Sequence, residues 1–287
     1  MIDLHMHTKY SDGSNTVEEI FKIAKSVGLD TIAITDHDIL SAMEESHKYE
    51  KLFGIKNIPA VEISTRYKDN RELHILAYLI DYKNKDFVEM LNWIRKTRKE
   101  RNINLIKLLN SLGYEFTLEE LIEVAEKESN IGRPHFARLL IEKGYFKSFD
   151  QVFTKLLAEG KPGYIERESI PPYKAIEMIH KAGGVAVLAH PLSYRFENKS
   201  EVKSLILDLV DHGIDGLEAE YVTYKRSDID WIKRLAKSLD LIITGGSDFH
   251  GKYKPHISLG KGLGSLYVPD KFIDSLYERQ ILNSKKD

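Results

Sequence analysis

The chain has 287 residues, of which 42% are hydrophobic and 30% are charged, as in ordinary globular proteins with a large buried core. Forty-two Lys and Arg residues against 44 Asp and Glu residues give a formal net charge of −2, which excludes a global basic field for nucleic acid. The absence of cysteine excludes disulfides and thiolate metal sites.

The N-terminal residues and the lengths of the apolar runs bear on where in the cell the protein is located. The first residues lack the basic stretch and the apolar stretch of a secretory signal, because Asp3 and His5 stand where the apolar stretch would be. Apolar runs such as GGVAVLA are far shorter than a membrane span. We therefore expect a soluble, cytoplasmic chain without membrane association, and no protein partner can be inferred.

The first 85 residues alternate between strand and helix patterns. The segment IDLH predicts a strand, and a helix follows from about Val17 to Val27. Thr16 and Glu19 have the spacing of a capping box at the start of this helix, and Gly28 lies just past its end. TIAIT predicts a buried parallel strand, which is followed by a helix over residues 40–52 and by strands at IPAVEI and ELHILAYLI.

From about Asp86 to about Tyr164 the pattern is helical. A long amphipathic segment closes at Gly113, and Thr117 and Glu120 have the spacing of a second capping box. After this block the strands VAVLAH, GLEAEY and LIITGG alternate again with helices, which predicts parallel βαβ units. We therefore expect an α/β barrel of about seven strands over residues 1–85 and 165–287, interrupted by a helical insert over residues 86–164.

Two pairs of polar residues have the i, i+2 spacing of neighbours on one face of a strand. His5 and His7 form the first pair, and Asp248 and His250 form the second. A single pair of this kind is more often a buried, hydrogen-bonded histidine pair than a ligand site. Whether such a pair binds a ligand is therefore decided by the other polar residues that the fold brings next to it.

Nearly every predicted strand carries an imidazole or a carboxylate at or near its C-terminal end, where a parallel barrel has its active site. Besides the two pairs, these residues are Asp12 in the SDG loop, His37 in TDHD, Glu62 in AVEIS, His74 in ELHILAY and His190 in VLAHP. Burying so many polar groups costs free energy unless they bind a partner, and divalent metal ions would be such a partner. Nine ligands are too many for one ion, and a nitrogen and oxygen set without sulfur favours Mn, Fe or Zn over Mg or Ca.

The motifs HMH, SDG, TDHD, VEIS, LHILAY, AHP and GGSDFHG resemble, in this order, the motifs of the PHP (polymerase and histidinol phosphatase) superfamily over residues 5 to 250. The resemblance implies a distorted (β/α)7 barrel with three divalent ions. It implies one ion held by His5, His7, Glu62 and Asp248, a second by Glu62, His74 and His190, and a third by Asp12, His37 and His250. No ligand position is missing, which argues against a degenerate domain without metal.

The insert contains a further motif, NIGRPHFARLL. Arg133 and His135 stand on either side of a proline at the expected start of a helix, where anions are favoured. Alternatively, Arg133 is a surface charge and His135 a capping residue. GRPHFAR resembles the insert motif of PHP proteins that act on nucleotides and RNA 5′ ends, namely 5′–3′ exoribonucleases and nucleoside 3′,5′-bisphosphate phosphatases. We expect Arg133 and His135 to bind the substrate phosphate, with Arg138, Arg195 and Lys161 as weaker candidates.

These observations predict a metal-dependent phosphoesterase whose substrates are phosphorylated nucleotides or the 5′ ends of RNA. A water bridging two of the ions would attack phosphorus, and His5, His7, Glu62 and Asp248 would act in catalysis through these ions. We expect the insert to cap this site, and truncation of the first few residues to impair metal binding. Three alternatives remain open: a phosphatase for histidinol phosphate or another small molecule, a C–N hydrolase of the amidohydrolase type, and a non-catalytic PHP module.

Overall fold

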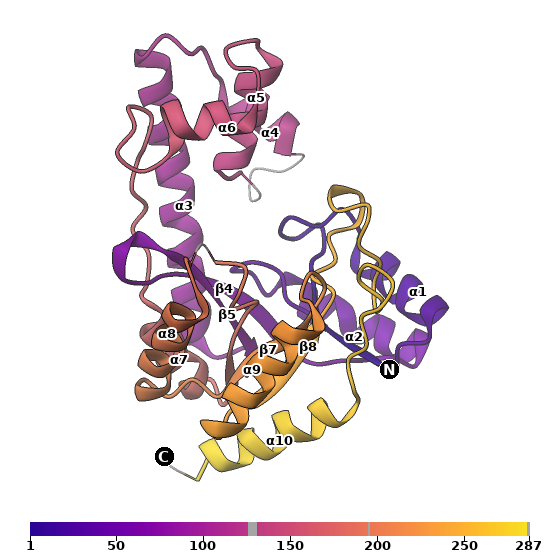
Figure 1. Ribbon diagram of the computed structural model, residues 1–287. Helices are drawn as coiled ribbons and strands as arrows, with labels where there is room; N and C mark the ends of the chain where they lie inside the picture. The colour runs from indigo at the N-terminus through magenta and orange to yellow at the C-terminus, as the bar shows by residue number, and fades with distance from the viewer. Residues whose placement is uncertain (126–130, 195, 286–287) are drawn as a thin grey trace. The chain divides into compact units, whose positions relative to one another are not determined.

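The computed structural model describes residues 1–125, 131–194 and 196–285. The chain separates into two compact units (Figure 1). We call Met1–Asn92 together with Ile170–Asp287 the sheet unit, and Trp93–Ser169 the helical unit. Both boundaries lie a few residues after those expected from the sequence.

The first strands of the sheet unit form a parallel sheet in the order β1-β2-β3. The helices between them begin and end close to the expected residues. In the first helix the Thr16 side chain accepts a hydrogen bond from Glu19 N, and Gly28 has the left-handed φ of 77°, which confirms the predicted caps. The elements are β1 (Ile2–Met6), α1 (Val17–Val27), β2 (Thr31–Ile34), α2 (Ser41–Phe53) and β3 (Lys56–Asn57).

A second sheet has the order β4-β5-β6-β7-β8, and its strands are not all parallel. Its strands are β4 (Ala60–Arg66), β5 (Glu72–Tyr78), β6 (Val185–Leu188), β7 (Gly216–Tyr221) and β8 (Ile242–Gly246). β5 runs antiparallel to both β4 and β6, so the expected uniformly parallel sheet is wrong here. The physical reason is the short connection over residues 67–71, because a parallel crossover needs about a dozen residues or more. The strands of the described residues thus form two sheets and no single closed barrel.

Backbone hydrogen bonds join the two sheets on both sides. Beside β1, Asp248 N donates to His5 O at 2.8 Å and His7 N donates to Phe249 O at 2.9 Å. Beside β2, Asp38 N donates to Glu62 O at 3.0 Å. A Cβ at Gly246 would lie 2.4 Å from His5 N, so only glycine permits this approach of β8 to β1. The backbone thus brings distant parts of the sequence to one edge.

Four helices follow in the sheet unit: α7 (Pro172–Lys181), α8 (Lys199–Asp211), α9 (Arg226–Ser238) and α10 (Lys271–Asn283). Apolar side chains from both sheets share one core with α10, in which Leu4, Leu76 and Val187 are fully buried and Phe272 packs against them. This core supports the strands beneath the edge that carries the histidines.

The helical unit has a core of its own. α3 (Lys85–Ser111) starts in the sheet unit and continues into this one, and α4 (Leu118–Ala125), α5 (Arg133–Glu142) and α6 (Phe149–Val152) follow. The predicted second capping box forms, because Glu120 N donates to Thr117 Oγ1 at 3.2 Å and Thr117 N donates to Glu120 Oε2 at 2.9 Å. Leu109, Leu121 and Phe136 are buried together. No helix in the described part of the chain has both the length and the apolar character of a membrane span.

Candidate metal centre

The nine residues expected to bind metal converge at one edge of the two sheets. His37, His190 and Asp248 follow directly on the ends of β2, β6 and β8, as the sequence predicts. His74 lies near the start of β5 instead, and reaches the same edge because β5 runs antiparallel to its neighbours. Glu62 lies inside β4 and not at its end, because β4 continues into the hairpin with β5.

Glu62 is buried at the centre of five imidazoles. Its Oε2 lies 3.3 Å from His5 Nε2 and 3.3 Å from His7 Nε2. The same oxygen is 3.2 Å from His37 Nδ1. Its Oε1 lies 3.0 Å from His74 Nδ1 and 3.1 Å from His190 Nε2. The two carboxylate oxygens therefore face different groups of histidines, as in a carboxylate that bridges two ions.

Two further carboxylates complete the cluster. Asp248 Oδ1 lies 3.3 Å from His7 Nε2 and 3.6 Å from His5 Nε2. Asp12 Oδ2 lies 3.6 Å from His37 Nε2 and 3.4 Å from His250 Nε2. Each aspartate thus faces the same kind of partner as Glu62.

Within the part of the chain that the structure describes, four overlapping groups have ligand atoms within 4.8 Å of one another, which is close enough to hold an ion. The groups are His7, Asp12, His37 and His250; His5, Glu62 and His190; His5, His7 and Asp248; and His37, Glu62 and His74. The third expected set, Asp12, His37 and His250, lies within the first of these groups. His5, His7, His37 and Glu62 each belong to two groups, so the cluster is continuous.

The hydrogen bonding of the buried histidines fits metal ions as the missing partners. Among the described residues, His5 Nε2, His7 Nε2 and His37 Nδ1 are buried without a hydrogen-bond partner. Burial, followed by the neighbouring His250, lowers the pKa of His7 to about 3, so its imidazole is neutral at neutral pH. Burial opposes the charged form of Glu62, but His37 and His74 hold the pKa of its carboxyl well below the usual range. Burial opposes the charged forms of three other histidines, but Glu218 raises the pKa of His5, Glu62 that of His74 and Asp12 that of His250. Because a metal ligand must be the neutral imidazole, ions bound here would displace protons from these rings.

Comparison with known proteins gives the family. The model of the PHP domain matches residues 3–237. This chain belongs to the PHP domain family. The resemblance inferred from the histidine and carboxylate motifs is thereby confirmed.

PHP proteins of known name align over nearly the whole chain. The 5′-3′ exoribonuclease Rnm of Escherichia coli is 35% identical over 263 residues, which cover 91% of this chain and 88% of that protein. The 3′,5′-nucleoside bisphosphate phosphatase of Chromobacterium violaceum is 31% identical over 249 residues, 87% of each chain. A crystal structure from Bifidobacterium adolescentis, described as a metal-dependent phosphoesterase, superposes with a TM-score of 0.79 at 29% identity and covers 97% of this chain and 96% of that one.

Glu218 contacts two of the clustered histidines, although it was not among the residues predicted from the sequence. It is fully buried in β7, where its Oε1 lies 2.8 Å from His5 Nδ1 and its Oε2 accepts a hydrogen bond from His190 N at 2.8 Å. The contact with Nδ1 leaves His5 Nε2 directed at the cluster, as a carboxylate behind a metal-ligating histidine does. The signal was present in GLEAEY, since an acidic residue in a buried strand is as unusual there as in AVEIS.

Other polar residues hold the ligand loops. Asp36 accepts hydrogen bonds from Thr8 Oγ1 at 2.6 Å and from Ser11 Oγ at 2.7 Å. Tyr221 Oη and Lys254 Nζ, which the sequence did not single out, donate to Asp248 Oδ2 at 2.8 Å and 2.7 Å. The other oxygen of Asp248 therefore remains directed at His5 and His7.

Backbone conformation is unusual at two of the proposed ligands. His190 has a φ of 28° and Asp248 a φ of 51°, in the region that residues other than glycine rarely adopt. Such conformations persist where surrounding contacts impose them, and they concentrate at functional sites. The hydrogen bonds from His190 N to Glu218 and from Asp248 N to His5 O are such contacts.

In the α5 segment (residues 132–138), His135 and Arg138 have local contacts, whereas Arg133 lies near a more distant residue. Gly132 N donates to His135 Nδ1 at 3.0 Å, so His135 caps the helix as the alternative interpretation had it. Arg133 lies with its guanidinium 5.9 Å from the centre of the Tyr164 ring. Arg138 Nε donates to Glu142 Oε1 at 2.8 Å on the exposed side of α5. Arg195 lies outside the described residues.

Three histidines outside the cluster, His47, His180 and His212, have ordinary partners within the protein. His180 Nε2 lies 2.8 Å from Asp215 Oδ2, and His47 Nδ1 lies 2.7 Å from Met43 O. His212 Nδ1 lies 2.7 Å from Asp208 O. Imidazoles with such contacts are accounted for without a ligand, which separates them from the histidines around Glu62.

Proposed function

We propose that this PHP protein is a metal-dependent phosphoesterase that hydrolyses phosphate esters of nucleotides or of RNA 5′ ends. The observation that carries the proposal is Glu62, whose two oxygens face separate groups of buried imidazoles. A bridging carboxylate between ions a few ångströms apart is typical of enzymes that displace groups at phosphorus. The names of the E. coli and C. violaceum relatives support nucleotides or RNA as the substrate class.

The proposed ligand set is the one inferred from the sequence, and three ions of Mn, Fe or Zn would be held by it. The ligands are His5, His7, Asp12, His37, Glu62, His74, His190, Asp248 and His250. When bound, such ions polarise a phosphoryl oxygen and lower the pKa of coordinated water toward neutrality. We infer that the two sheets, joined through His5–Asp248 and Asp38–Glu62, form the distorted barrel that carries this set.

The protein's own groups have defined roles in this proposal. Glu218 keeps His5 in the tautomer whose Nε2 lone pair faces the cluster. Tyr221 and Lys254 hold one oxygen of Asp248, so that the other points toward His5 and His7. This network fixes the ligand atoms before any ion binds, which limits the reorganisation needed during the reaction.

Phosphate binding is proposed for the α5 segment, with the insert at residues 86–164 capping the site. Since Gly132 N donates to His135 Nδ1, the neutral imidazole carries its proton on Nε2, which can donate to a phosphate oxygen. Arg133 would add a charged donor at the N-terminus of the same helix. Arg138, which would have to leave Glu142, and Arg195 are weaker members of this proposal.

A panel of substrates tests the function. With Mn added, phosphate release is measured from a nucleoside 3′,5′-bisphosphate, AMP and histidinol phosphate, and the products of 5′-phosphorylated RNA are resolved. Hydrolysis of C–N amidohydrolase substrates is measured by the amine released. We expect turnover of the bisphosphate or the RNA. Turnover of histidinol phosphate alone, or of the C–N substrates alone, would overturn the assignment.

A matched pair of variants links this activity to the cluster. His5→Ala should lose both bound metal and turnover, whereas His47→Ala, which removes a histidine with a purely local contact, should keep both. Full activity of His5→Ala in protein verified to be free of metal would support a different mechanism.

A further inference from the structure

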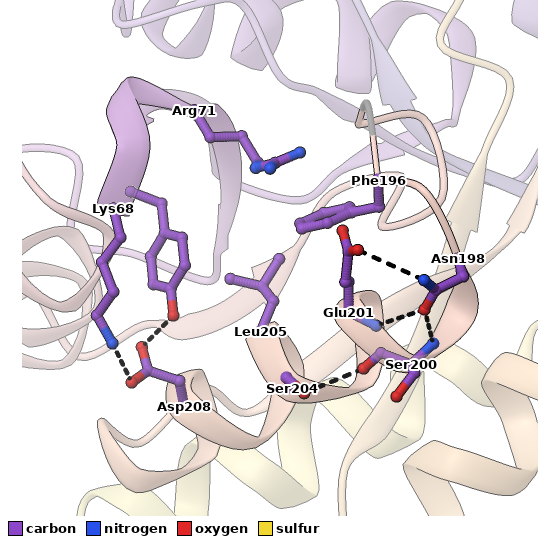
Figure 2. A pocket seen from close by; sticks show the side chains of 10 residues that line it. Lys68, Arg71, Phe196, Asn198, Ser200, Glu201, Ser204, Leu205 and Asp208 are labelled. Atoms are coloured by element: carbon purple, nitrogen blue, oxygen red, sulfur yellow. Dashed lines mark hydrogen bonds and ion pairs between the residues drawn. The ribbon is translucent and has the colours of Figure 1, made fainter.

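A second feature of the sheet unit is a pocket of about 580 Å³ between the β4–β5 hairpin and α8 (Figure 2). Tyr67, Lys68 and Arg71 form one wall, from the connection between the two strands. Phe196 and the first half of α8 form the other, with the buried Leu205 between them. This volume lies within the range that small-molecule sites occupy.

Each end of the pocket is held by a specific contact. At one end, Lys68 Nζ and Tyr67 Oη donate to the two oxygens of Asp208, each at 2.8 Å. At the other end, the guanidinium of Arg71 lies 4.0 Å from the centre of the Phe196 ring (Figure 2). These contacts fix the distance between the hairpin and α8, so the pocket is a defined part of the fold.

The positive and negative side chains that line the pocket offset each other, which disfavours binding of a phosphate. Lys68 is paired with Asp208, and Glu201 offsets the charge of Arg71 within the same lining. Glu201 is itself held by the cap of α8, because Asn198 Nδ2 donates to its Oε1 at 3.4 Å. A pocket with balanced charges, an aromatic ring and an arginine plane favours a neutral, planar, hydrogen-bonding group, which describes a nucleobase.

The pocket adjoins the proposed metal centre. Arg71 precedes His74 by three residues, so their Cα atoms are at most about 11 Å apart. On the other wall, the segment leading to Phe196 carries Tyr194, whose ring centre is 5.3 Å from that of His190. Tyr194 Oη also accepts a hydrogen bond from His74 N at 2.8 Å. Both walls are thus continuous with proposed metal ligands.

We propose that this pocket binds the base of the nucleotide whose phosphate lies at the metal centre, stacked on Phe196 and Arg71. The inference rests on the proposed function, since it concerns the same substrate. Stacking of this kind tolerates every base because each has a π face, so the pocket would recognise a nucleotide without selecting a sequence.

Photolabelling locates the base directly. The metal-loaded protein is mixed with 8-azidoadenosine 3′,5′-bisphosphate, irradiated at once, digested and mapped by mass spectrometry. We expect the label within residues 67–71 or 196–205, and we expect excess adenosine 3′,5′-bisphosphate to suppress it. Labelling confined to other segments, or no suppressible labelling, overturns the inference.

Kinetics of a matched pair of variants supply the second test. Phe196→Leu keeps an apolar side chain but removes the stacking face, and should lower kcat/KM for adenosine 3′,5′-bisphosphate about tenfold. The same variant should act normally on the abasic analogue, 1,2-dideoxyribose 3,5-bisphosphate. Tyr173→Leu, which removes a 51% exposed ring stacked on His212, is the control and should leave both values unchanged. An equal loss on both substrates contradicts the inference.

The two tests separate this inference from the function on which it rests. Phosphate release from nucleotides together with labelling outside the pocket retains the function and removes the base site. Labelling inside the pocket without any phosphate release retains a nucleotide site and removes the proposed reaction.

Discussion

The cluster around Glu62 and the α5 segment both hold histidines and charged residues, but their contacts differ in kind. Glu62 contacts five imidazoles from four segments of the chain, and His190 lies 128 residues away from it. In the α5 segment, His135 contacts Gly132 and Arg138 contacts Glu142, within a turn of the same helix. Six of the nine cluster residues are buried and three are half-buried, whereas the Arg138 side chain is 55% exposed.

This difference shows which features of a sequence point to a site. Local contacts form in any helix with the right spacing, and each contributes only about 0.2–0.5 kcal/mol. A buried carboxylate among imidazoles from distant strands has no such ordinary explanation, because uncompensated burial of these groups is costly. The cluster therefore supports the proposed function more strongly than the α5 segment does.

The largest effect is expected for Glu62→Gln. The amide keeps the shape but loses the charge that faces both groups of histidines, so bound metal should fall and kcat should drop on the order of a thousandfold. Metal content measured by mass spectrometry and phosphate release check this. Unchanged metal content would mean that Glu62 does not join the ions.

A smaller effect is expected for Glu218, which contacts the side chain of His5 and the backbone amide of His190. Glu218→Ala should weaken metal binding about 10- to 100-fold. Glu218→Gln, whose amide oxygen can still accept one of the two hydrogen bonds, should recover part of the loss. Metal titration measures both, and identical losses in the two variants would point to general destabilisation.

The α5 segment offers a comparison within one helix. Arg133→Ala should raise KM for a nucleotide about tenfold or more, the loss expected for a charged hydrogen bond to phosphate. Arg138→Ala, which removes a guanidinium already paired with Glu142, should change KM by less than about twofold. If neither variant changes KM, the segment is structural, and the contrast with the cluster becomes complete.

The smallest effect concerns Asp208, a surface contact between distant segments. The hydrogen bond from Lys68, and then that from Tyr67, lower the pKa of the Asp208 carboxyl. A lowered folded-state pKa stabilises the protein above the unfolded value of about 3.9 and ceases to do so as the pH falls through the folded value. Asp208→Asn should therefore lower the free energy of unfolding by less than about 1 kcal/mol at pH 7. Denaturant titrations should show this difference shrinking below about pH 4, and a difference that persists there would contradict the assignment.

The sequence predicted where the clustered histidines and carboxylates lie better than it predicted the arrangement of the strands. Side chains such as His190 and Asp248 could be placed because they follow apolar, β-branched runs whose ends are easy to recognise. The antiparallel direction of β5 was missed, although the connection over residues 67–71 is too short for a crossover.

Supporting contacts were harder to infer. Glu218 contacts a histidine 213 residues away, and a single sequence shows no sign of which distant partner a buried acid has. The pocket between the β4–β5 hairpin and α8 could not be predicted from the sequence either, because its two walls come from segments that meet only in the folded chain.

The pairing of His5 with Asp248 has a consequence for the order of folding. Contacts between residues so far apart in the sequence close a long loop. They form late in folding, after local contacts have offset part of the conformational entropy that is lost on loop closure. During synthesis, His5 and His7 are made before the helical unit and Asp248 is made after it. The complete cluster therefore forms only after both parts of the sheet unit have been made.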